Sequence, residues 1–102
     1  MSAFLLTPEA RADLFSIWEY IAEENLDAAD SVIATIEKTF HALADTPGVG
    51  HYRDDLLDRR YRFHNVYSYV IAYRYETVPI QIIAIVHGAR NLEAFFSGKQ
   101  LH

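Results

Sequence analysis

The second half of the chain holds the side chains that could act on a phosphate group. Six residues of suitable types are Tyr61, Arg62, His64, Arg74, His87 and Arg90. Cleavage of RNA by its own 2′-hydroxyl needs a base, an acid and cations that stabilise a pentavalent phosphorus. Histidine, tyrosine and arginine can supply all three. Ribonuclease chemistry is therefore the first possibility that these residues raise.

Each of these residues also has an ordinary structural role. Arg62 and His64 can border an exposed sheet face, and Arg74 can pair with Glu76 or with an acid of a partner. His87, which precedes a glycine, can orient a turn. The C-terminal tail lacks a lysine-rich cluster, and the chain is acidic where a protein that docks into ribosomal RNA should be basic. We therefore expect no catalytic residue.

A protein partner is the interpretation that we favour for these side chains. Arginine and tyrosine together commonly dominate binding at protein interfaces. The five tyrosines between residues 61 and 75 are also typical strand residues, and Phe95 and Phe96 either close the core or contact a partner. The candidate partner-binding residues are Arg53, Arg62, Tyr69, Arg74, His87, Arg90, Phe95 and Phe96.

Charge is distributed unevenly along the chain. Residues 1–45 contain nine acids and two bases, a balance of −7, and residues 46–102 contain five acids and seven bases, a balance of +2, which together give the net charge of −5. An acidic half and an arginine-bearing half indicate one face toward water and another toward an anionic partner. An acidic chain also disfavours non-specific binding of nucleic acid, and we expect no direct sequence-specific binding either.

Composition excludes several other kinds of site. The chain has no cysteine, which excludes disulfides, zinc–thiolate centres and thiol catalysis. His41, His51 and His102 show no metal-ligand spacing, so we expect no metal and no cofactor. The N-terminus lacks the pattern of a signal peptide, and no window approaches the roughly 18 apolar residues of a membrane helix. We expect one domain over residues 1–102 that is cytoplasmic and binds no membrane.

Two long strands joined by a short loop are the central element. Residues 67–75 and 80–86 are rich in β-branched and aromatic side chains, and residues 76–79 form the loop between them. Both strands are apolar on both faces, so each face of this hairpin needs a cover. We expect the rest of the chain to cover one face and a second polypeptide to cover the other.

The first half of the chain predicts two helices that supply the first cover. Thr7 is a candidate N-cap with Pro8 at the first helical position, and apolar residues follow at helical spacing. Asn25 or Asp27 can cap a second helix that runs to Ala44. So short a link predicts an antiparallel helical hairpin.

Three shorter segments complete the expected order. Residues 4–6 are a candidate strand, and residues 60–64 alternate as a strand with an apolar and a cationic side, followed by a tight connection at residues 65–66. Residues 91–96 can form one helical turn, and residues 51–59 give no firm assignment. The sequence therefore predicts an α+β fold in the order β-α-α-β-β-β. A short N-terminal strand and an αα-hairpin precede a three-stranded antiparallel meander, and the helices pack on one face of the sheet.

Several phrases, taken with their order and spacing, resemble the ParE/RelE superfamily of bacterial toxins and are closer to the ParE branch. They are Leu6-Thr7-Pro8-Glu9-Ala10 with Asp13-Leu14 and Ile17, Tyr20-Ile21-Ala22, Ala28-Ala29, Leu43-Ala44 with Pro47-Gly48-Val49-Gly50 and Arg53, Tyr69-Val70-Ile71-Ala72-Tyr73, and Ile83-Ala84-Ile85-Val86-His87-Gly88-Ala89-Arg90. Leu26 departs from the pattern, because many relatives carry proline there, and this bears only on the start of the second helix.

The resemblance implies the toxin of a type II toxin–antitoxin system. Such a toxin is held inactive in a hetero-oligomer with a cognate ParD-like antitoxin, whose C-terminal segment wraps it and whose acids would meet Arg62, Arg74 and Arg90. ParE-type toxins inhibit DNA gyrase, and the charge of this chain favours that function. The alternatives are a RelE-like ribosome-dependent mRNA endonuclease and an inactive binding module with the toxin fold.

Overall fold

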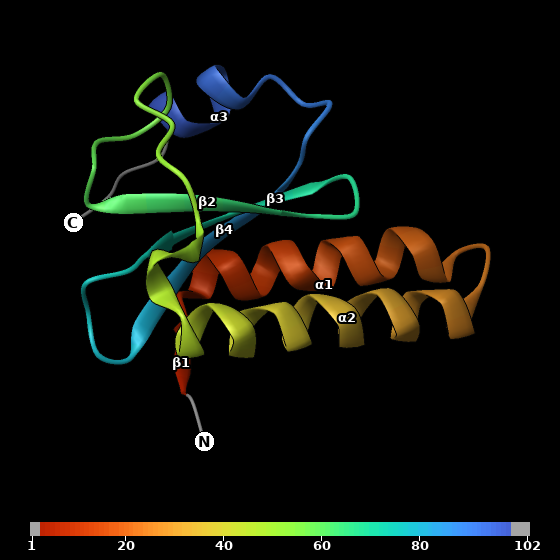
Figure 1. Ribbon diagram of the computed structural model, residues 1–102. Coiled ribbons are helices and arrows are strands. Elements are labelled where there is room, and N and C mark those ends of the chain that lie inside the picture. The colour runs from red at the N-terminus through yellow and green to blue at the C-terminus, as the bar shows by residue number, and fades with distance from the viewer. Residues whose placement is uncertain (1–2, 99–102) are drawn as a thin grey trace.

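The computed structural model describes residues 3–98 and confirms the predicted order of elements (Figure 1). The strands are β1 (Phe4–Leu6), β2 (Tyr61–Val66), β3 (Tyr69–Arg74) and β4 (Ile80–His87). The helices are α1 (Pro8–Ala22), α2 (Leu26–Asp45) and α3 (Leu92–Ser97), with a 3-10 turn, η1 (Pro47–Val49). None of the helices in residues 3–98 is long and apolar enough to cross a membrane.

The two long helices begin where the capping residues predict. The Thr7 side chain accepts the backbone N–H of Ala10 (3.2 Å), and Pro8 occupies the first helical position. Asn25 accepts the backbone N–H of Ala28 (2.9 Å), so Asn25 rather than Asp27 caps α2. The resulting hairpin of α1 and α2 lies on one face of the sheet (Figure 1).

The sheet has the strand order β1-β4-β3-β2. The last three strands form the predicted antiparallel meander, and β1 adds to β4 in parallel, with Phe4 opposite Ile80. The backbone N–H of Thr7 donates to the Ile82 carbonyl (3.1 Å) and extends this pairing to the start of α1. The first strand is thereby fixed to the last one.

The turn between β2 and β3 lies further along the chain than predicted. Asn65 and Val66 pair with Val70 and Tyr69 as strand residues, so they do not form the connection. The two-residue turn is at residues 67–68, where Tyr67 has a φ of 53°. This left-handed conformation is uncommon for a residue with a side chain, and for that reason the sequence did not indicate a turn at a tyrosine.

Side chains from the helical hairpin and one sheet face form the first core. Ala10, Ile36 and Phe40 of the helices are fully buried against Ile71 and Tyr73 of the sheet. These positions recur at three- and four-residue spacing in the helices and alternate along β3, which is the pattern of a helix face packed on a strand face. This part of the prediction is confirmed.

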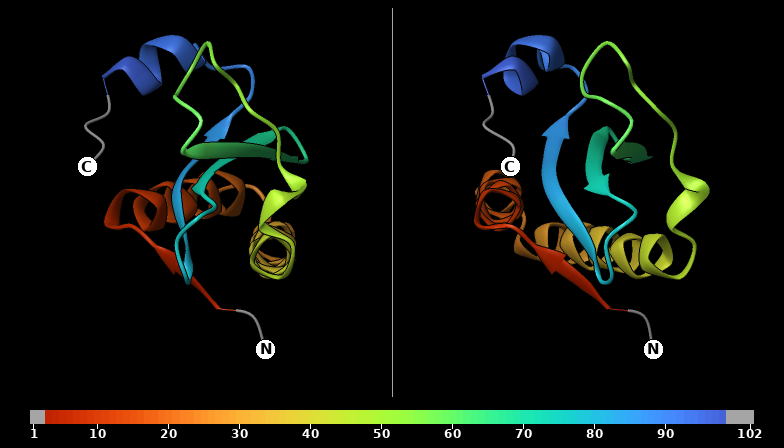
Figure 2. Two further views of the ribbon diagram at one scale, coloured as in Figure 1. Left: turned by 60° about the vertical axis from the view of Figure 1, so that its left-hand side comes forward. Right: turned by 90° about the vertical axis from the view of Figure 1, so that its left-hand side faces the viewer.

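The opposite sheet face is covered by the chain itself, so the expectation of a second polypeptide there is wrong. Phe96 of α3 is 2% exposed and packs edge-to-face on Phe63 of β2, with ring centroids 5.5 Å apart. Leu56 and Leu57 pack on the same face from the segment that gave no assignment. Figure 2 shows α3 and this segment on one side of the sheet and the long helices on the other. Charged residues surround Leu56 and Leu57 in the sequence, so the sequence did not predict that these two side chains pack on the sheet.

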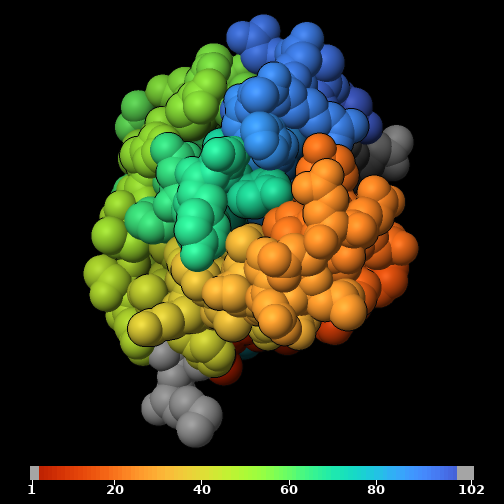
Figure 3. All heavy atoms as spheres, turned by 90° about the vertical axis from the view of Figure 1, so that its right-hand side faces the viewer, coloured from red at the N-terminus to blue at the C-terminus, as the bar shows by residue number. Residues whose placement is uncertain are grey.

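Three segments meet at one end of the molecule. Figure 3 shows this end, with the turn between α1 and α2 in orange, the turn between β2 and β3 in teal, and the segment after β4 in blue. The termini of three elements thus supply side chains to one surface.

Candidate functional site

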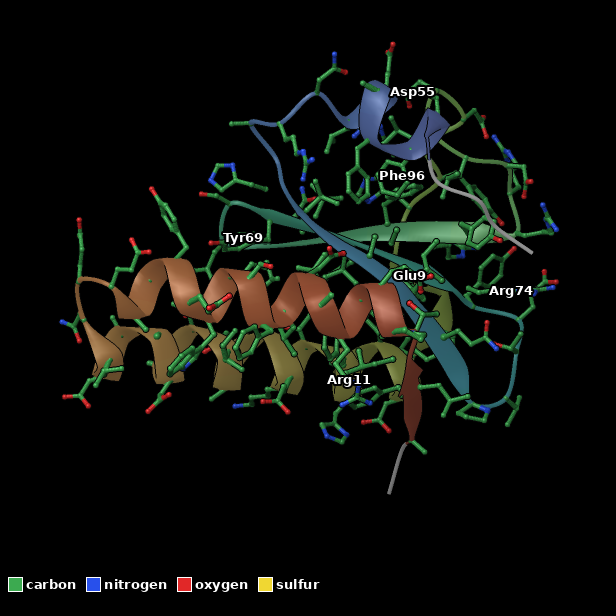
Figure 4. All side chains as sticks on the ribbon, turned by 180° about the vertical axis from the view of Figure 1, so that it is seen from behind. Glu9, Arg11, Asp55, Tyr69, Arg74 and Phe96 are labelled. Carbon is green, nitrogen blue, oxygen red and sulfur yellow. The ribbon has the colours of Figure 1, made fainter. Side chains whose placement is uncertain are left out.

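The structure does not bring the eight predicted partner-binding residues together. Arg74 pairs with Tyr61 at one end of the sheet, whereas Tyr69 pairs with His87 at the other end. Figure 4 shows Tyr69 and Arg74 far apart along the sheet. The predicted set therefore divides into two groups, and Tyr69, His87 and the residues after β4 form one of them.

Arg62 belongs to the other group and has a structural role. Its guanidinium donates to the Gly50 carbonyl (2.7 Å) and to the phenol oxygen of Tyr52 (3.2 Å). It also lies over the rings of Tyr52 (4.4 Å) and Tyr75 (4.5 Å). A guanidinium bonded and stacked in this way holds the loop after η1 to β2.

The residues considered for ribonuclease chemistry do not converge. Tyr61 is buried in the core between the sheet and α3, and His64 is half-buried on the opposite sheet face. Arg62 and Arg74 lie at the far end of the sheet from His87. Within residues 3–98, these side chains do not form a group of base, acid and cation around one reacting atom.

A groove of about 530 Å³ lies between α1 and the end of β4. One wall comes from α1 and the other from β3, β4 and the segment that follows. The lining residues are Asp13, Ser16, Ile17, Tyr20, Tyr69, Ile85, Val86, His87 and Arg90. Aliphatic and aromatic side chains alternate here with a few polar groups, which is the composition of a binding site.

The cationic wall of the groove is held by local contacts. The Arg90 N–H donates to the His87 carbonyl (3.0 Å), and the guanidinium of Arg90 lies 4.9 Å from the ring centre of Phe95. Nδ1 of His87 accepts the backbone N–H of Ala89 (3.1 Å), and His87 is exposed. Arg90 thus presents a positive charge beside an aromatic surface.

Tyr69 lies in the β3 wall of the groove. Its ring meets the His87 ring edge-to-face, with centroids 5.4 Å apart. Burial, together with the nearby Tyr20, raises the pKa of the Tyr69 phenol above its ordinary value. The phenol is therefore a neutral hydrogen-bonding group at physiological pH.

One edge of β4 faces α1 along the groove. The Gly88 N–H donates to the Ser68 carbonyl (2.7 Å), and partners alternate along antiparallel strands, so the backbone groups of Ile85 and His87 point to the other edge. Asp13 of α1 accepts the Ile85 N–H through Oδ2 (3.1 Å). The His87 N–H points to the same edge, and since His87 is exposed an extended segment can bond to it, whereas Ile85 is only 3% exposed.

The sequence did not single out Asp13 or Tyr20 as groove residues. An acid on an amphipathic helix usually faces water, but Asp13 lies next to the buried stripe, three residues after Ala10 and four before Ile17. An acid at such a position faces whatever lies beside the helix. That spacing is the signal that could have located it.

A second hollow of about 470 Å³ adjoins the groove and shares Tyr69 and His87 with it. Arg53 lines this hollow and is bound to Asp55 by two hydrogen bonds (2.9 and 2.7 Å). The Asp55 carboxylate raises the pKa of Arg53, and Arg53 lowers the pKa of Asp55. Phe96, in contrast, is a core residue and lies outside both hollows.

Comparison with known proteins gives the family. The family model described as ParE toxin of type II toxin-antitoxin system, parDE, matches residues 4–92. The chain belongs to the ParE toxin family. This ParE chain is also similar to a solved structure from the chromosomal ParDE TA system of P. aeruginosa, with 21% identity, a TM-score of 0.68, and coverage of 85% of this chain and 96% of that one. A search among curated proteins gave no match.

The family match includes both walls of the ParE groove. Helix α1 and strand β4 lie within residues 4–92, whereas α3 begins at Leu92, where the match ends. The similar solved structure agrees with the fold and, at its level of identity, with no more than the fold. As a family member the chain is a type II toxin.

Proposed function

We propose that this ParE toxin inhibits DNA gyrase and that a cognate antitoxin neutralises it by binding in the groove between α1 and β4. Membership of the ParE family is the observation that carries the proposal. The scattered positions of Tyr61, Arg62, Arg74 and His87 support a toxin that acts by binding and not by cutting RNA.

The groove supports the antitoxin part of the proposal. An extended segment can bond to the backbone N–H of His87 while its apolar side chains rest on Tyr69 and Ile17. An acidic residue of that segment can pair with Arg90. The resulting contact would combine main-chain bonds, apolar burial and one charge pair.

Of the candidate partner-binding residues, five retain that role in the proposal. Tyr69, His87 and Arg90 contact the antitoxin directly, Phe95 supports Arg90, and Arg53 lies in the adjoining hollow. Three are assigned elsewhere: Arg62 holds a loop, Phe96 fills the core, and Arg74 lies at the distant end of the sheet.

The test measures supercoiling by purified gyrase in the presence of the purified chain, alone and after mixing with the antitoxin encoded beside it. We expect the chain alone to inhibit supercoiling and the mixture to leave it intact. Translation on purified ribosomes is assayed in parallel. Cleavage of ribosome-bound mRNA with normal supercoiling would overturn the proposal and establish an endonuclease.

A further inference from the structure

The two-residue turn between β2 and β3 carries a tyrosine where other residues are favoured. Tyr67 has a φ of 53°, and Val66 and Tyr69 pair on either side of the turn. In this left-handed region a Cβ lies too close to the following carbonyl oxygen, so glycine, asparagine and aspartate are the usual residues of such turns. A tyrosine at this position therefore costs stability through its backbone.

The side chain of Tyr67 does little inside the fold to offset this cost. It is 62% exposed, and it makes no hydrogen bond, aromatic contact or cation–π contact with the rest of residues 3–98. In contrast, Tyr73 is buried, and the phenols of Tyr52 and Tyr75 are hydrogen-bonded to each other (2.9 Å). An unfavourable backbone conformation that the fold does not require points to a role in binding.

Tyr67 lines the hollow of about 470 Å³ that adjoins the groove. The hollow and the groove share the side chains of Tyr69 and His87. Figure 3 shows the turn that carries Tyr67, in teal, beside the segment after β4, in blue. A segment that leaves the groove past Tyr69 and His87 therefore enters the hollow next to Tyr67.

The chemistry of the hollow suits a carboxylate. Within the described part of the chain, its lining contains several hydrogen-bond donors, Arg53 among them, and no acid. Nε and Nη2 of Arg53 donate to Asp55 (2.9 and 2.7 Å), whereas Nη1 bonds to none of the residues from 3 to 98. The Arg53 side chain is 35% exposed, and the acids near it, Asp55 and Glu93, do not line the hollow. The N–H groups of Nη1 are thus available to a charged acceptor.

We propose that the antitoxin segment continues from the groove into this hollow, where the Tyr67 ring anchors it and Arg53 binds one of its acidic side chains. The inference rests on the proposed function and adds a second contact for the same partner. A tyrosine ring buries a large area on binding with little loss of side-chain freedom, which makes it an effective anchor. The bond from Arg53 to a carboxylate fixes the position of the segment along the surface.

The first measurement uses three substitutions that separate the ring of Tyr67 from its backbone. Tyr67→Phe keeps the ring, Tyr67→Ala removes the ring and keeps the unfavourable φ, and Tyr67→Gly removes both. Calorimetric titration gives the affinity of each chain for the antitoxin encoded beside it, and thermal unfolding gives the melting temperature. The control is Phe15→Ala, since Phe15 is 59% exposed and lies outside the groove and the hollow.

We expect Tyr67→Ala and Tyr67→Gly to bind the antitoxin at least about tenfold more weakly than the original chain, which corresponds to about 1.4 kcal/mol. Tyr67→Phe and the Phe15→Ala control should stay within about twofold of the original affinity. Tyr67→Gly should melt at a higher temperature than Tyr67→Ala, because glycine has no Cβ penalty at this φ. Affinity and stability then change independently, as a binding role for the ring requires.

The second measurement tests the bond to a carboxylate with two arginines of one loop. Arg53→Gln removes the guanidinium that lines the hollow. Arg59→Gln is the matched control, because Arg59 also donates to an aspartate, Asp54, through Nε and Nη2 (3.2 and 3.0 Å) but lies outside the hollow. Both substitutions remove one positive charge. We expect Arg53→Gln to weaken antitoxin binding about tenfold and to lower its salt dependence, and Arg59→Gln to change the affinity by less than about twofold.

Two results would overturn the inference and leave the proposed function standing. One is an antitoxin affinity of Tyr67→Ala and Tyr67→Gly equal to that of the original chain. The other is an equal effect of Arg53→Gln and Arg59→Gln on that affinity. Absence of any antitoxin binding by the original chain would refute the proposed function and the inference together, whereas normal gyrase supercoiling in the presence of the original chain would refute only the proposed target.

Discussion

Tyr69 and His87 face each other across β3 and β4, and their rings meet edge-to-face at 5.4 Å and 83°. The pair forms a ridge, because both the groove beside α1 and the hollow beside Arg53 use these two side chains as walls. A segment bound in either depression must touch the ridge. This position makes the pair the centre of the proposed antitoxin contact.

The first prediction concerns the exposed part of the groove. The double substitution His87→Ala and Arg90→Ala removes the ridge ring and the cation, and it should weaken antitoxin binding by about 2 kcal/mol or more, roughly thirtyfold. Both residues are exposed, so the melting temperature should change little. Calorimetric titration gives the affinity, and Arg11→Ala on the exposed side of α1 serves as the control. Unchanged affinity would place the antitoxin elsewhere.

The second prediction concerns Asp13, which closes part of the β4 edge. In Asp13→Ala the Ile85 N–H loses its acceptor, which should lower the free energy of unfolding by about 1–3 kcal/mol. Asp13→Asn retains an acceptor oxygen and should cost less. Ser16→Ala lines the same groove without this hydrogen bond and should be close to neutral. Urea denaturation measures all three, and equal stability of the Asp13 and Ser16 variants would contradict the assignment.

The third prediction separates two glycines of one loop. A Cβ added at Gly50 would lie 2.5 Å from the Tyr73 phenol oxygen and 2.8 Å from the Phe63 carbonyl oxygen, whereas a Cβ at Gly48 meets nothing within 4 Å. Gly50→Ala should therefore destabilise the fold by about 1–3 kcal/mol through overpacking. Gly48→Ala should not destabilise it. The melting temperatures of the Gly50→Ala and Gly48→Ala chains test this difference, and an equal melting temperature for the two would contradict it.

The fourth prediction concerns alkaline pH. Burial raises the pKa of the Tyr73 phenol above its ordinary value of 10.0, although the N–H of Gly50 opposes the shift. The unfolded chain therefore loses this proton first, so the stabilisation is complete below pH 10 and is lost as the pH rises toward the folded-state pKa. Tyr73→Phe should unfold more easily at pH 7, by about 1–3 kcal/mol, because the phenol also donates to the Pro47 carbonyl (2.7 Å). Its stability should then fall less steeply above pH 10.

The fifth prediction concerns the cover of the second sheet face. Phe96→Ala leaves a cavity over Phe63 and should cost about 3–5 kcal/mol of unfolding free energy. Truncation to alanine at an exposed site, Val78→Ala, should be nearly neutral, since Val78 is 99% exposed. A Phe96→Ala chain as stable as the original would mean that α3 does not seal this face.

Local signals in the sequence were sufficient for most of the fold. Thr7 and Asn25 cap their helices as predicted, because a short polar side chain followed by a helical apolar pattern has few other uses. The meander followed from two runs of β-branched and aromatic residues around a proline-containing loop. Both kinds of signal are confined to a few neighbouring residues.

The contacts that were missed depend on residues distant in the sequence. Leu56 and Leu57 lie among charges, and only their position over Phe63 shows that they are core residues. In the sequence, Arg62 has the features of an interface arginine. Only the structure shows that its guanidinium is hydrogen-bonded to Tyr52 and Gly50. For the same reason, residue types suggested partner binding but could not divide the candidates between the two ends of the sheet.

The pairing of β1 with β4 has a consequence for synthesis. Phe4 lies opposite Ile80, so the first strand leaves the ribosome 76 positions before the strand that it must join. The helical hairpin can form early, because its contacts are local, but the sheet must wait until nearly the whole chain has emerged. A nascent or prematurely terminated polypeptide therefore lacks a finished groove, so under the proposed function the antitoxin would bind there only when translation is almost complete.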